Sequence, residues 1–219
     1  MPVSRWDAVK LMVQKDLQVE LRRRSGLQGL IMFGVTALGA ISFSLGTPIV
    51  TPSLAGALLW ILLFFVSVVG LGQGFLQEEE AKTLDTLLLA APVESIFVGK
   101  TLANFLLLLA TLVVLLPLYF VLFQVPVGNY VFLGCTLLGG SFGLALGTTT
   151  VAALLSRGSV RGPLPAVLAF PLLLPLLMGA IQATVAAFHG EPGGLPLLIL
   201  YPLTLGSAVL LLVEYIWEE

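Results

Sequence analysis

The densest group of charged side chains lies in a polar stretch from Gln77 to Pro92, which reads QEEEAKTLDTLLLAAP. It opens with three consecutive carboxylates, Glu78, Glu79 and Glu80, followed by Lys82. In the first turn of a helix, carboxylates are stabilised by the positive end of the helix macrodipole, and a glutamate four residues before a lysine forms a favourable pair. The stretch therefore predicts a helix over residues 78–91 with charge concentrated at its start.

The second half of this stretch has an apolar face. Leu84, Leu87, Leu88 and Ala91 follow the i, i+3, i+4, i+7 spacing of one helix face. Pro92 ends the predicted helix, because proline disfavours helical backbone in the residue before it. A short amphipathic helix between two apolar runs either rests on lipid as a connector or docks against a partner protein. The residues alone leave both roles open.

Side chains suited to covalent, redox or metal chemistry are sparse. His189 is the only histidine and Cys135 the only cysteine. The sequence contains no cluster with metal-ligand spacing, no C-x-x-C-H haem attachment motif and no Ser/His/Asp set. It also lacks the G-x-x-x-x-G-K-[ST] loop that binds the phosphates of ATP. We therefore expect no catalysis by this chain alone, and energy for any transport must come from another subunit.

The composition indicates an integral membrane protein. Hydrophobic residues make up 58% of the 219 residues and charged residues 10%, whereas soluble domains average about 25% charged residues. This length accommodates about six spans of roughly 20 residues each and leaves no room for a separate soluble domain. We expect an all-α fold with a single transmembrane domain over residues 1–219, and nothing indicates nucleic-acid binding.

Six apolar runs are each long enough to cross about 30 Å of hydrocarbon as a helix. They are residues 27–45, 53–76, 98–123, 130–155, 163–187 and 195–217. Residues 1–25 precede them and predict an interfacial amphipathic helix that begins with a capping box at Ser4. Its apolar face would contain Trp6, Val9, Val13, Leu17 and Leu21.

The distribution of Lys and Arg predicts the topology. If the N-terminus is cytoplasmic, every cation lies on the inner side. These cations are Arg5, Lys10, Lys15, Arg22, Arg23, Arg24, Lys82, Lys100, Arg157 and Arg161. The outer turns then contain only His189 and Glu191 as ionisable residues. Both termini are expected in the cytoplasm, with Lys100 near an inner end, from where its side chain reaches water.

Glycines and prolines predict the packing of the later spans. Gly139, Gly143 and Gly147 form consecutive G-x-x-x-G spacings in the fourth apolar run, which allow close helix packing. The fifth run contains four prolines that kink a helix and leave backbone carbonyls for neighbouring helices to satisfy. The prolines are Pro163, Pro165, Pro171 and Pro175.

Three segments of the sequence resemble the CcmB family, the membrane permease of the haem exporter system for cytochrome c maturation. They are KDLQVELRRRSGL, QEEEAKTLDTLLLAAPVES and AFPLLLPLLMGA. In that family and in ABC-2 type permeases generally, the inner loop after the second span has acidic residues, Gly-Thr-Leu-Glu, leucines and a proline. Thr83, Leu84, Leu87 and Pro92 match this pattern. Lys82 and Asp85 stand where the family has glycine and glutamate.

The resemblance implies an ABC-2 type permease, without enzymatic activity of its own, in a bacterial inner membrane. Residues 77–97 would form a cytoplasmic coupling helix and loop that docks on ABC ATPase subunits. The coupling residues would be Glu78, Glu79, Glu80, Lys82, Thr83, Leu84, Asp85, Leu87, Leu88 and Pro92. The partner ATPase would bind ATP, and haem would be cargo of the complex rather than a resident cofactor.

The resemblance further implies a second membrane subunit, either another copy of the chain or a haem-handling partner. Two alternatives remain at this point: an ABC-2 permease for a lipid, drug or ion, and a membrane assembly factor that transports nothing.

Overall fold

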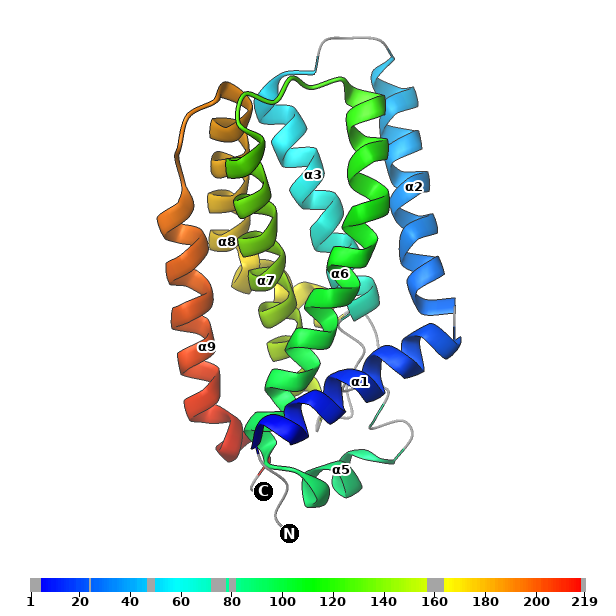
Figure 1. Ribbon diagram of the computed structural model, residues 1–219, viewed down its shortest axis with the longest axis vertical. Coiled ribbons are helices and arrows are strands. Elements are labelled where there is room, and N and C mark those ends of the chain that lie inside the picture. Colours follow the sequence, from blue (N-terminus) through cyan, green and yellow to red (C-terminus); the bar gives the residue numbers. More distant parts are fainter. Residues whose placement is uncertain are drawn as a thin grey trace.

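The computed structural model describes residues 5–23, 25–46, 50–71, 78, 82–156 and 164–217. Helices joined by short connections make up this part of the chain, as expected for an all-α protein (Figure 1). The helices are α1 (Arg5–Arg23), α2 (Ser25–Leu45), α3 (Pro52–Val66), the π-helix η1 (Ser67–Leu71), α5 (Leu84–Ala90), α6 (Val93–Phe123), α7 (Tyr130–Leu155), α8 (Leu164–His189) and α9 (Leu195–Trp217).

Five helices in the described residues are long and apolar enough to cross a membrane. They are α2, α3 with its π-helical extension, α6, α7 and α8. The prediction of six spans is therefore met in five cases. The helix α9 coincides with the sixth predicted run, but its apolar stretch over Leu195–Leu211 is shorter. The chain is a multi-pass membrane protein.

The helix α6 begins earlier than predicted. Its first residue is Val93 rather than Val98, because Pro92 sets the backbone for helix entry and its carbonyl accepts hydrogen bonds from the amides of Ser95 and Ile96. The resulting helix has 31 residues. This length exceeds the thickness of the hydrocarbon core, so one end of α6 extends beyond it.

The bundle is organised around α7, which contacts α6, α8 and α9 (Figure 1). The predicted close packing at its glycines is confirmed, although neighbouring side chains rather than backbones fill the space. A Cβ atom at Gly143 would lie 2.7 Å from Leu176, and one at Gly147 would lie 2.3 Å from Leu173. Gly143 and Gly147 of α7 thus leave room for the side chains of Leu176 and Leu173 of α8.

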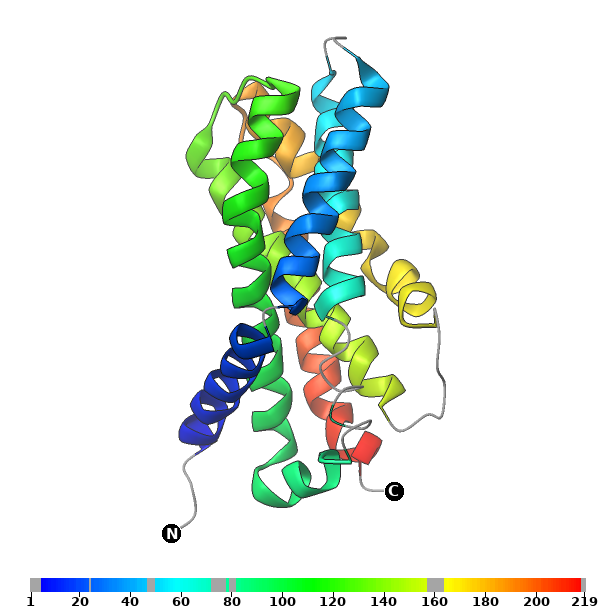
Figure 2. The ribbon, with the colours of Figure 1, turned by 90° about the vertical axis from the view of Figure 1, so that its right-hand side faces the viewer.

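The helix α8 continues through Pro171 and Pro175. In Figure 2 its first turns, drawn in yellow, diverge from the rest of the helix. The hydroxyl of Tyr201 in α9 donates a hydrogen bond to the carbonyl of Leu172 between the two prolines. A neighbouring helix therefore bonds to the proline-containing segment, although the carbonyls that lose a donor to Pro171 and Pro175 are those of Val167 and Pro171. Pro163 lies outside the described residues.

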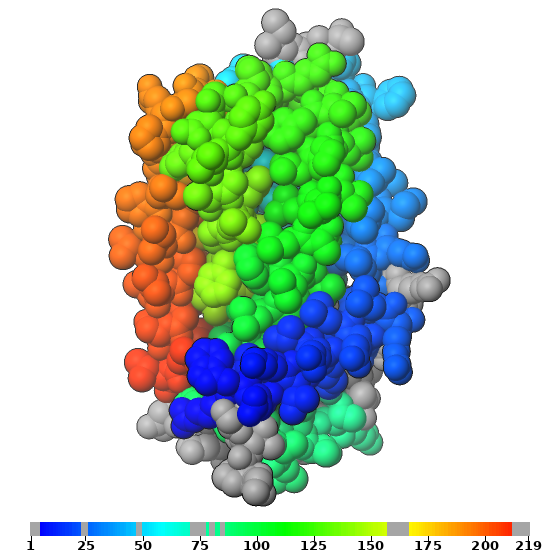
Figure 3. All heavy atoms as spheres, in the orientation of Figure 1, coloured from blue at the N-terminus to red at the C-terminus, as the bar shows by residue number. Residues whose placement is uncertain are grey.

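The helix α1 lies obliquely across the lower part of α6 (Figures 1 and 3). Close approach is possible because Gly99 has no side chain: a Cβ there would lie 2.6 Å from Cβ of Met12. The predicted apolar face is only partly correct. Val9 is buried, whereas Trp6 and Leu21 are 73% and 61% exposed. The predicted capping residue Ser4 lies outside the described residues.

Three segments gather at one end of the molecule. The start of α1, the short helix α5 and the end of α9 all lie at the lower end in Figures 1 and 2. We call this the α5 end. The turns after α6 and α8 lie at the opposite end, where the amides of Gly128 and Asn129 donate hydrogen bonds to the carbonyls of Phe188 and Ala187.

Candidate functional site

The predicted helix over residues 78–91 is shorter in the structure. The helix α5 contains only seven residues, Leu84–Ala90. Lys82 has a left-handed backbone with φ of 55°, which cannot continue a right-handed helix from Glu78. The amide of Thr83 instead donates a hydrogen bond to the carbonyl of Glu78 over 2.9 Å, so the chain turns before α5 starts. Glu79 and Glu80 lie outside the described residues.

The left-handed backbone of Lys82 has a steric cost. Glycine adopts a positive φ without steric cost, whereas other residues adopt it at a cost of about 1 kcal/mol. The resemblance described above implies glycine at this position, so Lys82 adds a steric cost to the turn.

The apolar face of α5 packs on the chain itself. Leu87 and Leu88 are half-buried and, with Ala91, lie against a cluster of apolar side chains from four helices. The cluster consists of Met12, Ile96, Phe97, Leu146, Ala152, Ala153 and Val209. Leu89 points away from it and is 90% exposed. The leucine face that the sequence predicts for docking is therefore partly covered by the chain's own helices.

Thr86, Leu89 and Ala90 are the exposed residues of α5 whose side chains are described. Lys82, Thr83 and Pro92 at its two ends are also exposed. The first turn of α5 is formed by Leu84 and Asp85. The surface formed by Lys82, Thr83, Thr86, Leu89 and Ala90 is called the outer face of α5 below.

Glu78 belongs to a network of charged side chains that joins three segments of the chain. The ammonium group of Lys15 in α1 donates a hydrogen bond to its carboxylate. Nζ of Lys100 in α6 lies 3.4 Å from both Oε1 of Glu78 and Oδ2 of Asp16. Nζ of Lys15 lies 3.3 Å from Oδ1 of Asp16. Two cations and two anions therefore alternate around the junction.

This charge network overturns two expectations. Lys100 does not reach water, because its side chain is only 3% exposed and is enclosed between α1 and α6. Glu78 pairs with Lys15 and Lys100 rather than with Lys82. Lys15 and Asp16 were not identified as site residues from the sequence. The available signal was Lys100 itself, a cation beside a long apolar run, which requires a counter-charge when it is buried.

The surroundings of Glu78 favour its charged form. Burial by itself would raise the pKa of the carboxyl, but hydrogen bonds from Lys15 and Thr83 and the nearby charge of Lys100 lower it to about 2. Burial likewise opposes the charge of Lys15, while Glu78 and Asp16 raise the pKa of its ammonium group overall. Glu78 is thus an anion throughout the physiological pH range.

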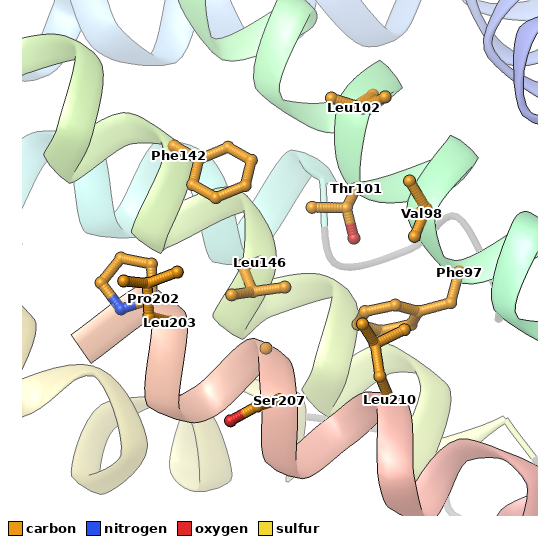
Figure 4. A pocket seen from close by; sticks show the side chains of 11 residues that line it. Phe97, Val98, Thr101, Leu102, Phe142, Leu146, Pro202, Leu203, Ser207 and Leu210 are labelled. Atoms are coloured by element: carbon orange, nitrogen blue, oxygen red, sulfur yellow. The ribbon is translucent and has the colours of Figure 1, made fainter. Parts of the chain in front are cut away.

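An apolar pocket of about 370 Å³ lies between α6, α7 and α9 (Figure 4). Its walls include Phe97, Leu146, Leu203 and Leu210, which point toward one another from the three helices. The hydroxyl of Thr101 also lines the pocket and has no hydrogen-bond partner in the described part of the chain. None of the lining residues is the His, Met, Cys or Tyr that typically coordinates haem iron.

Among the residues that the structure describes, no group of three or more His, Cys, Asp or Glu side chains is placed to hold a metal ion. The charge network alternates cations with anions, so its carboxylates are already neutralised by Lys15 and Lys100. What this arrangement provides is a rigid junction between α1, α6 and the segment before α5.

Comparison with known proteins identifies the family. The family model described as "CcmB protein" matches residues 7–214. The chain belongs to the CcmB family. "Heme exporter protein B" of Bradyrhizobium diazoefficiens is 29% identical over 206 residues, covering 93% of each chain. "Heme exporter protein B" of Rhodobacter capsulatus is 27% identical over 207 residues, covering 92% of this chain and 94% of the relative.

The family match confirms the resemblance found in the sequence. CcmB proteins are membrane permease subunits, so the expectation of a non-catalytic membrane subunit agrees with the family. The matched range includes all but the first two residues of α1, together with the charge network, α5 and the apolar pocket.

Proposed function

We propose that this chain is the permease subunit of an ABC-type haem exporter complex that acts in cytochrome c maturation. The family match over residues 7–214 is the observation on which the proposal rests. The alignments cover more than nine tenths of each relative. Because the chain has no phosphate-binding loop, ATP hydrolysis occurs on a partner subunit.

The ATPase docks at the α5 end. The outer face of α5 supports this part of the proposal, since Leu89 is 90% exposed at the end of the molecule where α1 begins. Among the remaining coupling residues, those from Lys82 to Pro92 shape this surface, and Glu78 connects it to α6. Glu79 and Glu80 belong to the same proposed loop.

The proposed topology has six spans with both termini in the cytoplasm of a bacterial inner-membrane protein. The five long helices are completed by α9, whose 23 residues suffice to cross the bilayer. The cations of α1 and Lys82 near α5 then share the cytoplasmic side. A second membrane subunit, either another copy or a haem-handling protein, completes the complex with haem as cargo.

Deletion and co-purification test the proposal. Removing the gene should abolish c-type cytochromes while leaving b-type cytochromes intact, and the tagged chain should retain an ABC ATPase in mild detergent. Normal c-type cytochromes in the deletion strain would refute the role in maturation. Normal maturation together with loss of export of a lipid or drug would instead favour an ABC-2 permease for another cargo. Loss of maturation without any retained ATPase would favour an assembly factor.

A further inference from the structure

We propose that the ion pair between Lys100 and Glu78 couples α5 to α6, so that a force applied to the outer face of α5 reaches the membrane-spanning part of α6 at two points. This inference rests on the proposed function, in which α5 receives the ATPase. Lys100, Glu78 and Asp16 are positioning residues in this mechanism, since they act through α5 and contact neither cargo nor nucleotide.

The chain from Glu78 to Lys100 forms a loop that this ion pair closes. At the start of α5, the amide of Thr83 is bonded to the Glu78 carbonyl, and Oγ1 of Thr83 donates to Oε2 of Glu78 over 2.5 Å. The other carboxylate oxygen of Glu78 lies 3.4 Å from Nζ of Lys100, 22 residues further along the chain. Glu78 therefore joins the start of α5 to the body of α6.

The opposite end of α5 is attached covalently. Ala91 has an extended backbone, and Pro92 then begins α6, accepting hydrogen bonds from Ser95 and Ile96. With the ion pair in place, α5 is held to α6 at both of its ends. Without the ion pair, the described part of the chain would still hold α5 through Ala91 and Pro92, through the packing of Leu87 and Leu88, and through the bond between Glu78 and Lys15 of α1.

The helix α1 strengthens the same junction. Lys15 bonds to Glu78, and Asp16 lies 3.4 Å from Lys100. The close approach of α1 to α6 at Gly99, next to Lys100, encloses the network. Each cation thus faces both anions, and movement of α5 away from α6 would separate opposite charges at several contacts.

Burial distinguishes this network from an ordinary surface ion pair. The side chains of Lys100, Glu78 and Asp16 are 3%, 15% and 19% exposed. Separating a buried pair leaves each charge without a counter-charge and away from water. The buried pair therefore resists being pulled apart. Arg5 and Glu94 also link α1 to α6, over 3.2 Å, but their side chains are 76% and 33% exposed. Water and salt weaken such a pair.

The experiment compares variants of the two pairs in the full complex. Lys100→Met and Glu78→Gln remove charge from the buried network, Lys100→Arg keeps the charge, and Glu94→Gln is the matched surface control. Two quantities are measured on variants without labels: ATPase retained on purification and c-type cytochrome formed in cells. The third, the distance distribution between spin labels at Leu89→Cys and Val113→Cys in a Cys135→Ala background, is measured separately. Leu89 and Val113 are both exposed, on α5 and α6.

Lys100→Met and Glu78→Gln should retain the ATPase within about twofold of the unaltered chain but form at least tenfold less c-type cytochrome. Their spin-label distance distribution should widen at least twofold, because α5 then moves independently of α6. Lys100→Arg should restore most of the cytochrome and the narrow distribution. Glu94→Gln should match the unaltered chain in all three measurements.

Normal cytochrome formation by Lys100→Met, or an unchanged distance distribution, would overturn the inference. Loss of ATPase in proportion to cytochrome in both network variants would also overturn it, since the network would then merely shape the docking surface. If Lys100→Met fails to accumulate, Glu78→Gln decides by the same criteria. Failure of the proposed function is recognised separately, because the unaltered chain would then retain no ATPase.

Discussion

Nε1 of Trp60 in α3 donates a hydrogen bond to Oγ1 of Thr184 in α8 over 2.7 Å. The bond fixes the indole ring, which is fully buried and lies against Gly140 of α7. Thr184 also donates to the carbonyl of Ala180. Three helices therefore meet at the indole ring of Trp60. Its only polar group, the Nε1–H, has the hydrogen-bond partner that a buried tryptophan usually finds.

The first prediction concerns the space beside this ring. A Cβ at Gly140 would lie 2.1 Å from Cη2 of Trp60, so Gly140→Ala should destabilise the protein by about 1–3 kcal/mol through overpacking. Gly134→Ala is the matched control in the same helix, because its Cβ meets nothing within 4 Å. Thermal unfolding in detergent measures both. Equal unfolding midpoints for Gly140→Ala and Gly134→Ala would contradict the close packing of Trp60 against Gly140.

The second prediction concerns the turn before α5. Lys82→Gly should relieve the cost of a left-handed backbone, about 1 kcal/mol. This corresponds to about fivefold greater hydrogen-exchange protection of the α5 amides, if they open locally. Lys82→Ala removes the charge but retains the backbone cost, so it should show no gain. If Lys82→Gly and Lys82→Ala protect the α5 amides equally, the charge of Lys82 rather than its backbone conformation would determine the stability of α5.

The third prediction concerns pH. The pKa of Glu78 falls from 4.5 to about 2 on folding, so its stabilising contribution is complete above about pH 4.5 and is lost as the pH falls toward 2. The groups that face it are Lys15, Lys100 and Thr83. The upper limit of this contribution is about 3.5 kcal/mol, since one pKa unit corresponds to about 1.4 kcal/mol, and solvent weakens it further.

Unfolding midpoints of the unaltered chain and Glu78→Gln should therefore differ most above pH 5, differ less at pH 3 and converge only near pH 2. A difference that stays constant across this range would show that the ionisation of Glu78 does not contribute to stability.

The fourth prediction separates the two faces of α5. Leu89→Glu changes a side chain that is 90% exposed, so the protein should accumulate normally but retain at least tenfold less ATPase. Leu87→Glu places a carboxylate against the apolar cluster around Met12 and Phe97, which should cost about 2 kcal/mol of stability. Co-purification and membrane abundance distinguish the two effects. Normal ATPase retention by Leu89→Glu would remove the outer face of α5 from the docking site.

The fifth prediction concerns topology. In a Cys135→Ala background, a cysteine at Pro126 should react with an impermeant thiol reagent added to intact cells, and a cysteine at Thr86 should react only after the cells are opened. Both positions are exposed, at opposite ends of the molecule. The reverse pattern would place α5 outside and invalidate the cytoplasmic docking of an ATPase.

Much of the fold was predictable because membrane insertion depends on local composition. The runs 130–155 and 195–217 coincide with α7 and α9, since about 20 consecutive apolar residues suffice to define a span. The three segments that resemble the CcmB family were also recognisable from residue types and spacing alone. The start of α6 was placed five residues late, because Glu94 and Ser95 are polar although Pro92 already begins the helix.

The site itself was only partly predictable. Helical periodicity placed Leu87 and Leu88 on one face of α5 but could not show that the chain's own helices cover this face. The left-handed conformation of Lys82 depends on the turn that Thr83 and Glu78 form together. A prediction from periodicity assumes an uninterrupted helix. It therefore placed residues 78–83 in the same helix as α5, although the left-handed backbone of Lys82 interrupts the helix there.

The sequence alone determined the class of protein, the positions of most spans and the family, because each depends on residues that are neighbours in the chain. Only the tertiary structure decided that Lys100 is buried beside Glu78 and Asp16, from which it is separated by 22 and 84 residues. A cation near the end of a span can reach water or pair with a distant anion. The approach of α1 to α6 at Gly99 excludes water and leaves the pairing.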